Sequence, residues 1–298
     1  MMAKHTNVIR VPFGVGALVW ILLVASRGVG QTQSPDVATS ELVRQTAAHE
    51  LAAIDTSGQY MYRVREETPQ GSETSIMIET RDLQVGRLIL KNGQPLSPAQ
   101  RQREEERLRS LLTNRTRLLK LQTEQQSDEA RVYKVIQALP DAFLYQHAGT
   151  ETDSTGRKLV LVTFRPNPDF RPPSLELRVL QGVEGAALID PVAKRIVRIE
   201  AKLSQDVDFG WGIFDRVSRG GGFLLEQQVV WHDQWAMTAL TLHFTNRLLL
   251  LITSRLDSVT KVSDFRQMPN DLTHQQTLEM LLDQDPMTAA VPGLGETP

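Results

Sequence analysis

Residues 157–265 form a succession of short apolar or alternating segments separated by turn residues, and no long helical pattern interrupts them. Lys158 to Phe164 is mostly apolar, while Arg195 to Leu203 alternates between apolar and charged residues. A period of two places successive side chains on opposite faces of a strand, so the second segment predicts one buried and one wet face. Strands that follow one another without long crossover helices pair antiparallel. The pattern therefore predicts a large, curved antiparallel sheet.

Further segments extend this predicted sheet. The early strands are expected at Gln59–Glu67, Glu73–Arg81 and Arg87–Lys91. Two hairpins are expected where segments flank turn residues, Phe143–Thr152 with Arg157–Arg165, and Gly185–Asp190 with Arg195–Leu203. The closing strands are expected at Phe223–Trp231, Ala236–Phe244 and Arg255–Phe265.

A long segment with a helical period lies between the early strands and the first hairpin. Ser97 and Pro98 are typical of an N-cap and a first helical residue, and Leu139-Pro140 is typical of a helix end. The wholly polar stretch 125–129 predicts a break or kink between them. The leucines of this segment form a stripe that must be buried, namely Leu108, Leu111, Leu112, Leu118 and Leu119. We expect about residues 97–139 to form a helical lid on the apolar face of the sheet.

Shorter helices are expected near the two ends of the mature chain. Ser34 and Pro35 predict the start of the first helix, which ends before Gly58. A second helix is expected over Thr273–Asp283, within a tail that contains proline and glycine. This composition predicts that residues 268–298 are loosely held.

Residues 1–30 have the pattern of an export signal. Lys4 and Arg10 precede an apolar core, Val11 to Ala25, and small residues follow it. The core is short for a membrane span, although Arg27 after it leaves an uncleaved N-terminal anchor as an alternative. We therefore expect residues 31–267 to be a single domain, exported to the periplasm or outside the cell, and not integral to the membrane once the signal is cleaved.

Composition and motifs exclude several functions. Charges nearly balance at a formal net charge of −2, so no overall field favours nucleic acid. The chain has no cysteine, which excludes disulfides, thiol catalysis and a lipid-modified N-terminal cysteine. His232, Asp233 and His243 could meet as metal ligands, but the first two lie in an expected hairpin turn, and a solvated turn is the favoured interpretation. Without a catalytic or cofactor-binding motif, we expect neither an enzyme nor a cofactor.

The apolar face of the predicted sheet is the main candidate for a functional site. When a wide sheet curls round a few helices, its core is often incompletely filled and forms a cleft for an elongated apolar ligand. The residues expected to line this cleft are Val160, Val162, Val197, Ile199, Leu225, Leu242, Leu111 and Leu118. A solid core is an equal alternative, because periodicity reports burial and not whether a void remains.

Several short segments carry a resemblance to known proteins. They are Lys91 to Pro98 before the charged helix, Leu139 to Phe143 after it, Phe164 to Pro168, and Ile189-Asp190. Together they resemble a family of exported bacterial proteins of unassigned function, over about residues 60–265. By general shape that family is similar to the periplasmic lipoprotein-sorting carriers of the LolA/LolB type. The resemblance implies an α+β fold in which an unclosed half-barrel sheet carries helices on its concave face and holds acyl chains in an apolar cavity.

Two functional hypotheses follow. The first is a non-enzymatic binding protein of the cell envelope that holds an acyl chain, a lipid or a lipidated protein in the apolar cleft. The second is a structural or protein-interaction component of the envelope with a solid core and no ligand, whose charged helix and polar sheet face contact an envelope protein. A ligand that co-purifies with the mature protein would distinguish them.

Overall fold

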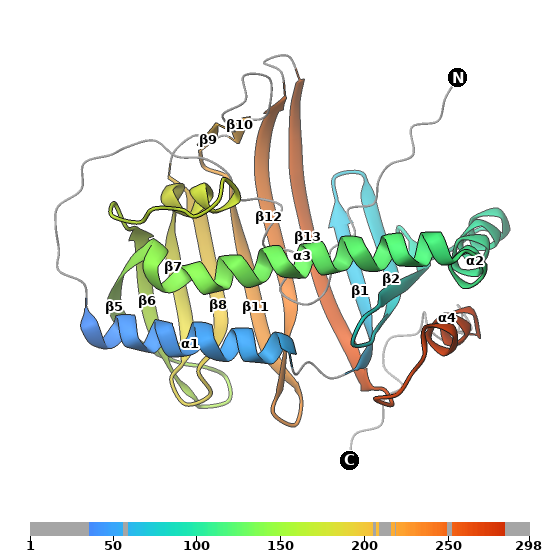
Figure 1. Cartoon of the computed structure of the whole chain (residues 1–298), viewed down its shortest axis with the longest axis horizontal. Helices are drawn as coiled ribbons and strands as arrows, with labels where there is room; N and C mark the ends of the chain where they lie inside the picture. The colour runs from blue at the N-terminus through green and yellow to red at the C-terminus, as the bar shows by residue number, and fades with distance from the viewer. Residues whose placement is uncertain are drawn as a thin grey trace.

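The computed structural model describes residues 36–55, 59–204, 207–208, 216–217, 219–248 and 252–283. These residues form an α+β fold in which helices cross one face of a large antiparallel sheet (Figure 1). The predicted signal segment or anchor and residues 284–298 of the tail lie outside the described residues. No helix in the described segments combines the length and apolarity that a bilayer crossing requires.

One unclosed sheet organises the molecule. Its strands in chain order are β1 (Tyr60–Thr68), β2 (Gly71–Glu79), β3 (Gln84–Lys91), β4 (Gln94–Pro95), β5 (Phe143–Thr152), β6 (Lys158–Pro166), β7 (Val183–Asp190), β8 (Arg195–Leu203), β11 (Gly222–Trp231), β12 (Gln234–Leu248) and β13 (Ile252–Gln267). They lie side by side in the order β4-β3-β2-β1-β13-β12-β11-β8-β7-β6-β5, and the short strands β9 (Val207–Asp208) and β10 (Arg216–Val217) pair beside β12. Every neighbouring pair is antiparallel, as the sequence predicted.

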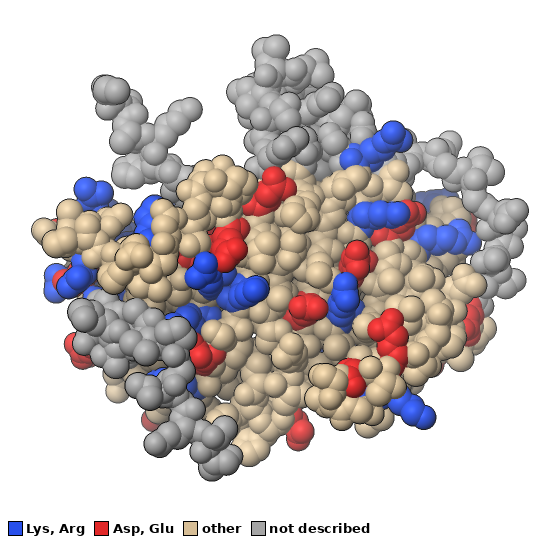
Figure 2. Space-filling model, turned by 180° about the vertical axis from the view of Figure 1, so that it is seen from behind, with Lys and Arg blue, Asp and Glu red and all other residues tan. Residues whose placement is uncertain are grey.

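The two faces of the sheet differ as expected. On the face that carries no helix, Lys, Arg, Asp and Glu side chains mingle without a large area of one sign (Figure 2). Arg198 and Glu200 pair along β8 at 3.2 Å, and Lys202 pairs with Glu184 of β7 at 3.3 Å. Exposed pairs of this kind contribute little stability. The opposite face holds the main apolar cluster, which includes Val162, Ala201 and other residues of β5 to β12.

Strand β8 departs from the predicted alternation. Ile189 of β7 pairs with Ile196, while Leu188 pairs with Arg198, so Val197 is an extra residue in a β-bulge. A bulge interrupts the period of two and re-aims the side chains beside it. Ile196 therefore takes the place of Val197 in the register that Ile199 follows, so the predicted alternation does not hold at Val197.

Helix α1 (Val37–Asp55) is capped by Asp36. The Asp36 carboxylate accepts hydrogen bonds from the backbone N–H of Ala38 at 3.1 Å and of Thr39 at 3.3 Å, which is N-cap geometry. The predicted cap Ser34 lies outside the described residues. Helix α1 runs beside α3 across the sheet (Figure 1) and presents Val43 and Ala47 as buried residues.

The central helical segment divides into α2 (Pro98–Thr113) and α3 (Arg115–Ala142). Ser97 caps α2 in a capping box with Gln100, and Pro98 occupies the first position, as predicted. The break lies at Asn114, not at the predicted stretch 125–129. Asn114 is extended and its side chain accepts the N–H of Arg117 at 3.1 Å, so it ends one helix and caps the next.

Helix α3 also continues past the predicted end. Pro140 lies in the last turn of the helix. Because proline has no backbone N–H, only one of the final helical hydrogen bonds is lost there. Asn167 supplies donors to the carbonyl groups that the helix end leaves unpaired. Its backbone N–H donates to the Ala142 carbonyl and its side-chain amide to the Asp141 carbonyl, both at 2.9 Å.

A second apolar cluster lies at the end of the sheet that carries β3. Leu108 and Leu111 of α2 are buried there with Leu278 and Leu281 of α4 (His274–Asp283). The guanidinium of Arg87 donates to the Leu281 and Leu282 carbonyl oxygens at 2.8 Å and 2.7 Å. The prediction of a loosely held tail is thus wrong for residues 274–283, because two leucines and a buried arginine fasten them. A short 3-10 helix, η2 (Glu176–Gly182), forms the last part of the β6–β7 connection.

The leucine stripe gives a test of this arrangement. Leu111 is 7% exposed, whereas Leu119 is 50% exposed and does not belong to the buried stripe that the sequence predicted. We expect Leu111→Asp to lower the free energy of unfolding by more than about 3 kcal/mol, because it places an unpaired carboxylate in the α2–α4 cluster. Leu119→Asp should change it by less than about 0.5 kcal/mol. Urea unfolding of both variants measures the difference, and equal effects would contradict this packing.

Candidate ligand-binding cavity

A cavity of about 560 Å³ lies between the sheet and helices α1 and α3. Its size falls within the roughly 300–1,000 Å³ of small-molecule sites. The apolar walls include Val43 and Ile54 of α1, Val132, Val135 and Ile136 of α3, and Phe143, Phe164, Ala187 and Phe223 of the sheet. Close-packed interiors rarely leave voids much larger than a water molecule, so a space of this size inside the apolar layer is a candidate site.

Three of the residues predicted to line a cleft do lie in the cavity wall, namely Val162, Ile199 and Leu225. Val160 and Leu242 do not line it. They belong to, or pack against, the main apolar cluster on the same face of the sheet. Periodicity placed these two on the correct face, but the position of the cavity along each strand depends on where the helices lie.

The other predicted lining residues lie elsewhere. Leu111 and Leu118 belong to the α2–α4 cluster at the far end of the sheet. Val197 is the bulge residue of β8, and its neighbour Ile196 lines the cavity instead. Of the predicted lid over residues 97–139, only α3 lies over the cavity, and α2 packs outside it. Helix α1, which the predicted lid did not include, lies over the cavity beside α3.

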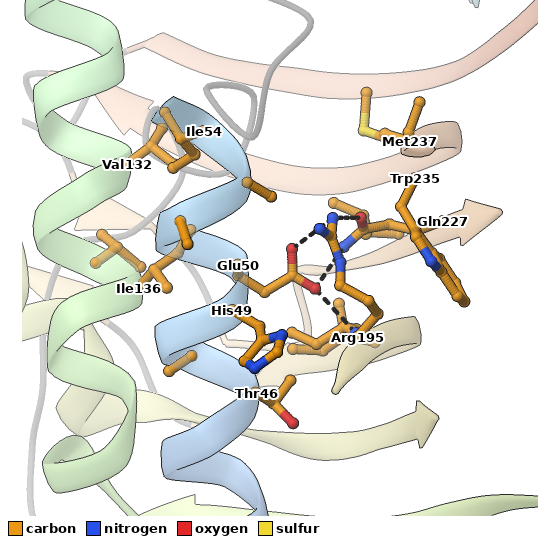
Figure 3. A pocket seen from close by; sticks show the side chains of 18 of the residues that line it. Thr46, His49, Glu50, Ile54, Val132, Ile136, Arg195, Gln227, Trp235 and Met237 are labelled. Carbon is orange, nitrogen blue, oxygen red and sulfur yellow. Dashed lines mark hydrogen bonds and ion pairs between the residues drawn. The ribbon is translucent and has the colours of Figure 1, made fainter. Parts of the chain in front are cut away.

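A buried polar cluster closes one part of the cavity wall (Figure 3). Glu50 of α1, only 2% exposed, pairs with the Arg195 guanidinium at 3.0 Å. The backbone N–H of Ile196, next to the bulge, donates to the other Glu50 oxygen at 2.9 Å. The Gln227 amide oxygen of β11 accepts from Arg195 at 3.2 Å. The cluster therefore joins α1 to β8 and β11.

Burial and the arginine act on Glu50 in opposite directions. Removal from water disfavours the charged carboxylate and raises the pKa of Glu50, while Arg195 and the hydrogen-bond donors partly lower it. Arg195 also stacks near the Trp235 ring, with its guanidinium carbon 5.9 Å from the ring centroid, and Arg157 lies at 5.1 Å. Trp235 lines the cavity beside this cluster, so a cationic and aromatic border limits the cavity here.

A second polar cluster lies in the cavity wall near β1 and β2. Glu79 accepts a hydrogen bond at Oε2 from the Tyr62 hydroxyl at 2.9 Å, and the Gln84 amide donates to that hydroxyl at 2.7 Å. Enclosure by these neighbours is the main cause that raises the pKa of Glu79 to about 7, and the Glu129 carboxyl of α3 adds to it. Glu79 is thus a carboxyl that changes charge near neutral pH inside the cavity.

Sequence reasoning missed these polar residues. Glu50 lies among the apolar positions of the first helix, between Ala47 and Ile54, and a charged residue on such a face was the available signal. The polar stretch 125–129 gave a second signal, but it indicates cavity-facing residues and not a break. Gln125 binds the backbone of Gln84 through both its amide oxygen and its amide nitrogen.

The histidines considered as metal ligands lie apart. His232 occupies the β11–β12 turn with a φ of 44°, whereas His243 lies within β12, where its ring contacts Asp257 at 3.1 Å. In the described part of the chain, no group of three or more His, Cys, Asp or Glu side chains is arranged to hold a metal ion.

Comparison with known proteins gives little further information. No family model matches the chain, and no curated protein matches it. A crystal structure of a DUF1329 family protein from Desulfovibrio piger ATCC 29098 is similar over 79% of this chain and 94% of that chain. The two proteins share 9% sequence identity with a TM-score of 0.29, so this neighbour indicates neither a ligand nor an activity.

The Glu50 cluster gives a stability prediction. Glu50→Ala should lower the free energy of unfolding by about 3–5 kcal/mol, because Arg195 would be left buried without its partner. Glu41→Ala is the matched control on the same helix, since Glu41 and Arg44 are both more than half exposed. It should cost less than about 1 kcal/mol. Denaturant unfolding tests both, and a Glu50→Ala variant as stable as the control would contradict the role of this pair.

Glu79 gives a pH prediction. Its pKa is raised from 4.5 to about 7. Between pH 4.5 and about pH 7, Glu79 therefore holds a proton in the folded protein but has lost it in the unfolded chain. Stability should therefore fall by roughly 1–3 kcal/mol as the pH rises from about 4.5 through about 7, and the loss should be complete above that. In Glu79→Gln this part of the pH dependence should be absent. Thermal unfolding across the pH range measures it, and parallel curves for the two proteins would refute the prediction.

Proposed function

We propose that the protein is an exported, non-enzymatic binding protein that holds an acyl chain, a lipid or the acyl chain of a lipidated protein in this cavity. The observation that carries the proposal is the void of about 560 Å³ with apolar walls from both the sheet and the helices. An elongated apolar ligand would bury its surface against Val132, Phe164 and Leu225, which burial of apolar area favours. The alternative, an envelope component with a solid core, has no need of such a space.

The same proposal extends to the shape and location of the protein. An unclosed antiparallel sheet with α1 and α3 across one face supports an arrangement of the LolA/LolB carrier type (Figure 1). The basic and apolar pattern of residues 1–30 supports export to the periplasm or the cell exterior. In this setting the protein would keep the acyl chain of its ligand out of water.

Ligand binding can be tested directly. Mature protein is first examined by native mass spectrometry for a co-purifying mass that disappears after denaturation and refolding. The refolded protein is then titrated with dodecanol against a fluorescent apolar dye, because a neutral head group tests the apolar cavity alone. We expect saturable displacement of the dye with one dodecanol per chain. If no mass co-purifies and dodecanol displaces no dye, the proposal is overturned.

A cavity-filling variant gives a sharper prediction. Ala53 of α1 lines the cavity, and Ala48 of the same helix is exposed. Ala53→Trp should weaken dodecanol binding by about tenfold or more, because the indole occupies the space of the chain. Ala48→Trp should leave binding unchanged. Circular dichroism checks that both variants are folded, and unchanged binding by folded Ala53→Trp would place the ligand elsewhere.

A further inference from the structure

The polar end of the cavity near β1 and β2 has the composition of a cation-binding site. Tyr60 and Tyr62 of β1 and Phe265 of β13 all line it, together with the carboxyls of Glu79 and Glu129. The Phe265 ring centroid lies 6.3 Å from that of Tyr60, at 82° between the ring planes, and 5.3 Å from that of Tyr62, at 31°. Aromatic faces grouped beside carboxylates attract positively charged groups, quaternary ammonium above all.

The Glu79 carboxyl has unused binding capacity. Its Oε2 accepts from the Tyr62 hydroxyl and lies 3.4 Å from the Gln84 amide nitrogen, whereas Oε1 accepts no hydrogen bond from any described residue. Glu79 also forms no ion pair within the described segments. Arg81, which follows it in the β2–β3 turn and reaches the cavity wall, is exposed and does not pair with it. A half-buried carboxyl without a cation is less favourable when charged than one in water, and a bound cation would relieve this.

We propose that this end of the cavity binds the ammonium group of an amphipathic ligand whose apolar chain occupies the rest of the space. The inference rests on the proposed function and specifies its ligand class as a chain with a cationic nitrogen head. Glu79 supplies the charge, the rings of Tyr60, Tyr62 and Phe265 supply cation–π faces, and Glu129 adds a second carboxyl from α3. A carboxylate head would meet like charge here, so a free fatty acid is the disfavoured ligand.

Protonation of Glu79 should accompany binding. The titratable and charged groups around it are Tyr60 and Tyr62 on β1, Glu129 on α3, and Arg81 and Asp82 in the β2–β3 turn. Burial and the nearby Glu129 carboxyl raise the pKa of Glu79 to about 7. Burial raises the pKa of Tyr60, and the charge of Glu79 raises it further. A bound ammonium would lower the pKa of Glu79, so binding near pH 7 should release a proton.

The experiment is isothermal titration of the mature protein with three probes of equal chain length, dodecyltrimethylammonium, dodecylammonium and dodecanoate, below their micelle concentrations. At pH 8 the ammonium probes should bind at least about tenfold more tightly than dodecanoate. Glu79→Gln, which keeps the size of the side chain, should abolish this preference. Glu73→Gln on the same strand, where Glu73 pairs with Lys91 on the sheet surface at 2.9 Å, should retain it.

Two further readouts separate this role from a structural one. Titration at pH 7 in buffers of different ionisation enthalpy should show proton release on binding of dodecyltrimethylammonium to the wild type, and none in Glu79→Gln. At pH 5.5 the preference for ammonium should shrink, because Glu79 is protonated. Stronger binding of the quaternary than the primary probe would assign the larger share to the aromatic rings, and the reverse to direct donation to Glu79.

The outcomes for the two proposals are distinguishable. Equal binding of dodecanoate and the ammonium probes, or a preference that survives in folded Glu79→Gln, would overturn the ammonium site while the apolar cavity stands. Failure of these probes and of dodecanol to bind would overturn both.

Discussion

The buried pair of Glu50 and Arg195 holds α1 against the sheet, and the cavity depends on that attachment. Glu50 reaches from the helix to a guanidinium of β8 and to the N–H of Ile196 at the β8 bulge. A buried carboxylate is unfavourable unless donors surround it, so the bulge and the arginine have to be in place for the helix to dock.

The space beneath the helices has a second cause. Ala47 of α1 packs with Val132 and Ile136 of α3, so these helices direct part of their apolar surface toward each other. Only the remaining surface of these three residues faces the sheet, where they line the cavity. The cavity wall combines apolar residues with two polar clusters, that of Glu50 with Arg195 and that of Glu79.

Local residue pattern predicted the strands because each strand carries its own signal. The alternation in β8 beyond its bulge, the turn before β6 and the Ser97-Pro98 cap all act within a few residues, and each is found in the structure. The errors concern partners distant in sequence. The polar stretch 125–129 continues as helix because Gln125 is paired with Gln84, and Pro140 is tolerated because Asn167 completes the helix end. Neither partner can be recognised from local periodicity.

The sequence by itself determined an antiparallel α+β fold, the apolar face of its sheet, and part of the cavity wall, since Val162, Ile199 and Leu225 are apolar residues of strand segments that must bury one face. Only the tertiary structure decided that a void remains and that Glu79, Tyr60 and Phe265 meet at its end. The physical reason is that periodicity encodes which side of an element is buried, while the volume left between elements depends on how helices and sheet pack against one another.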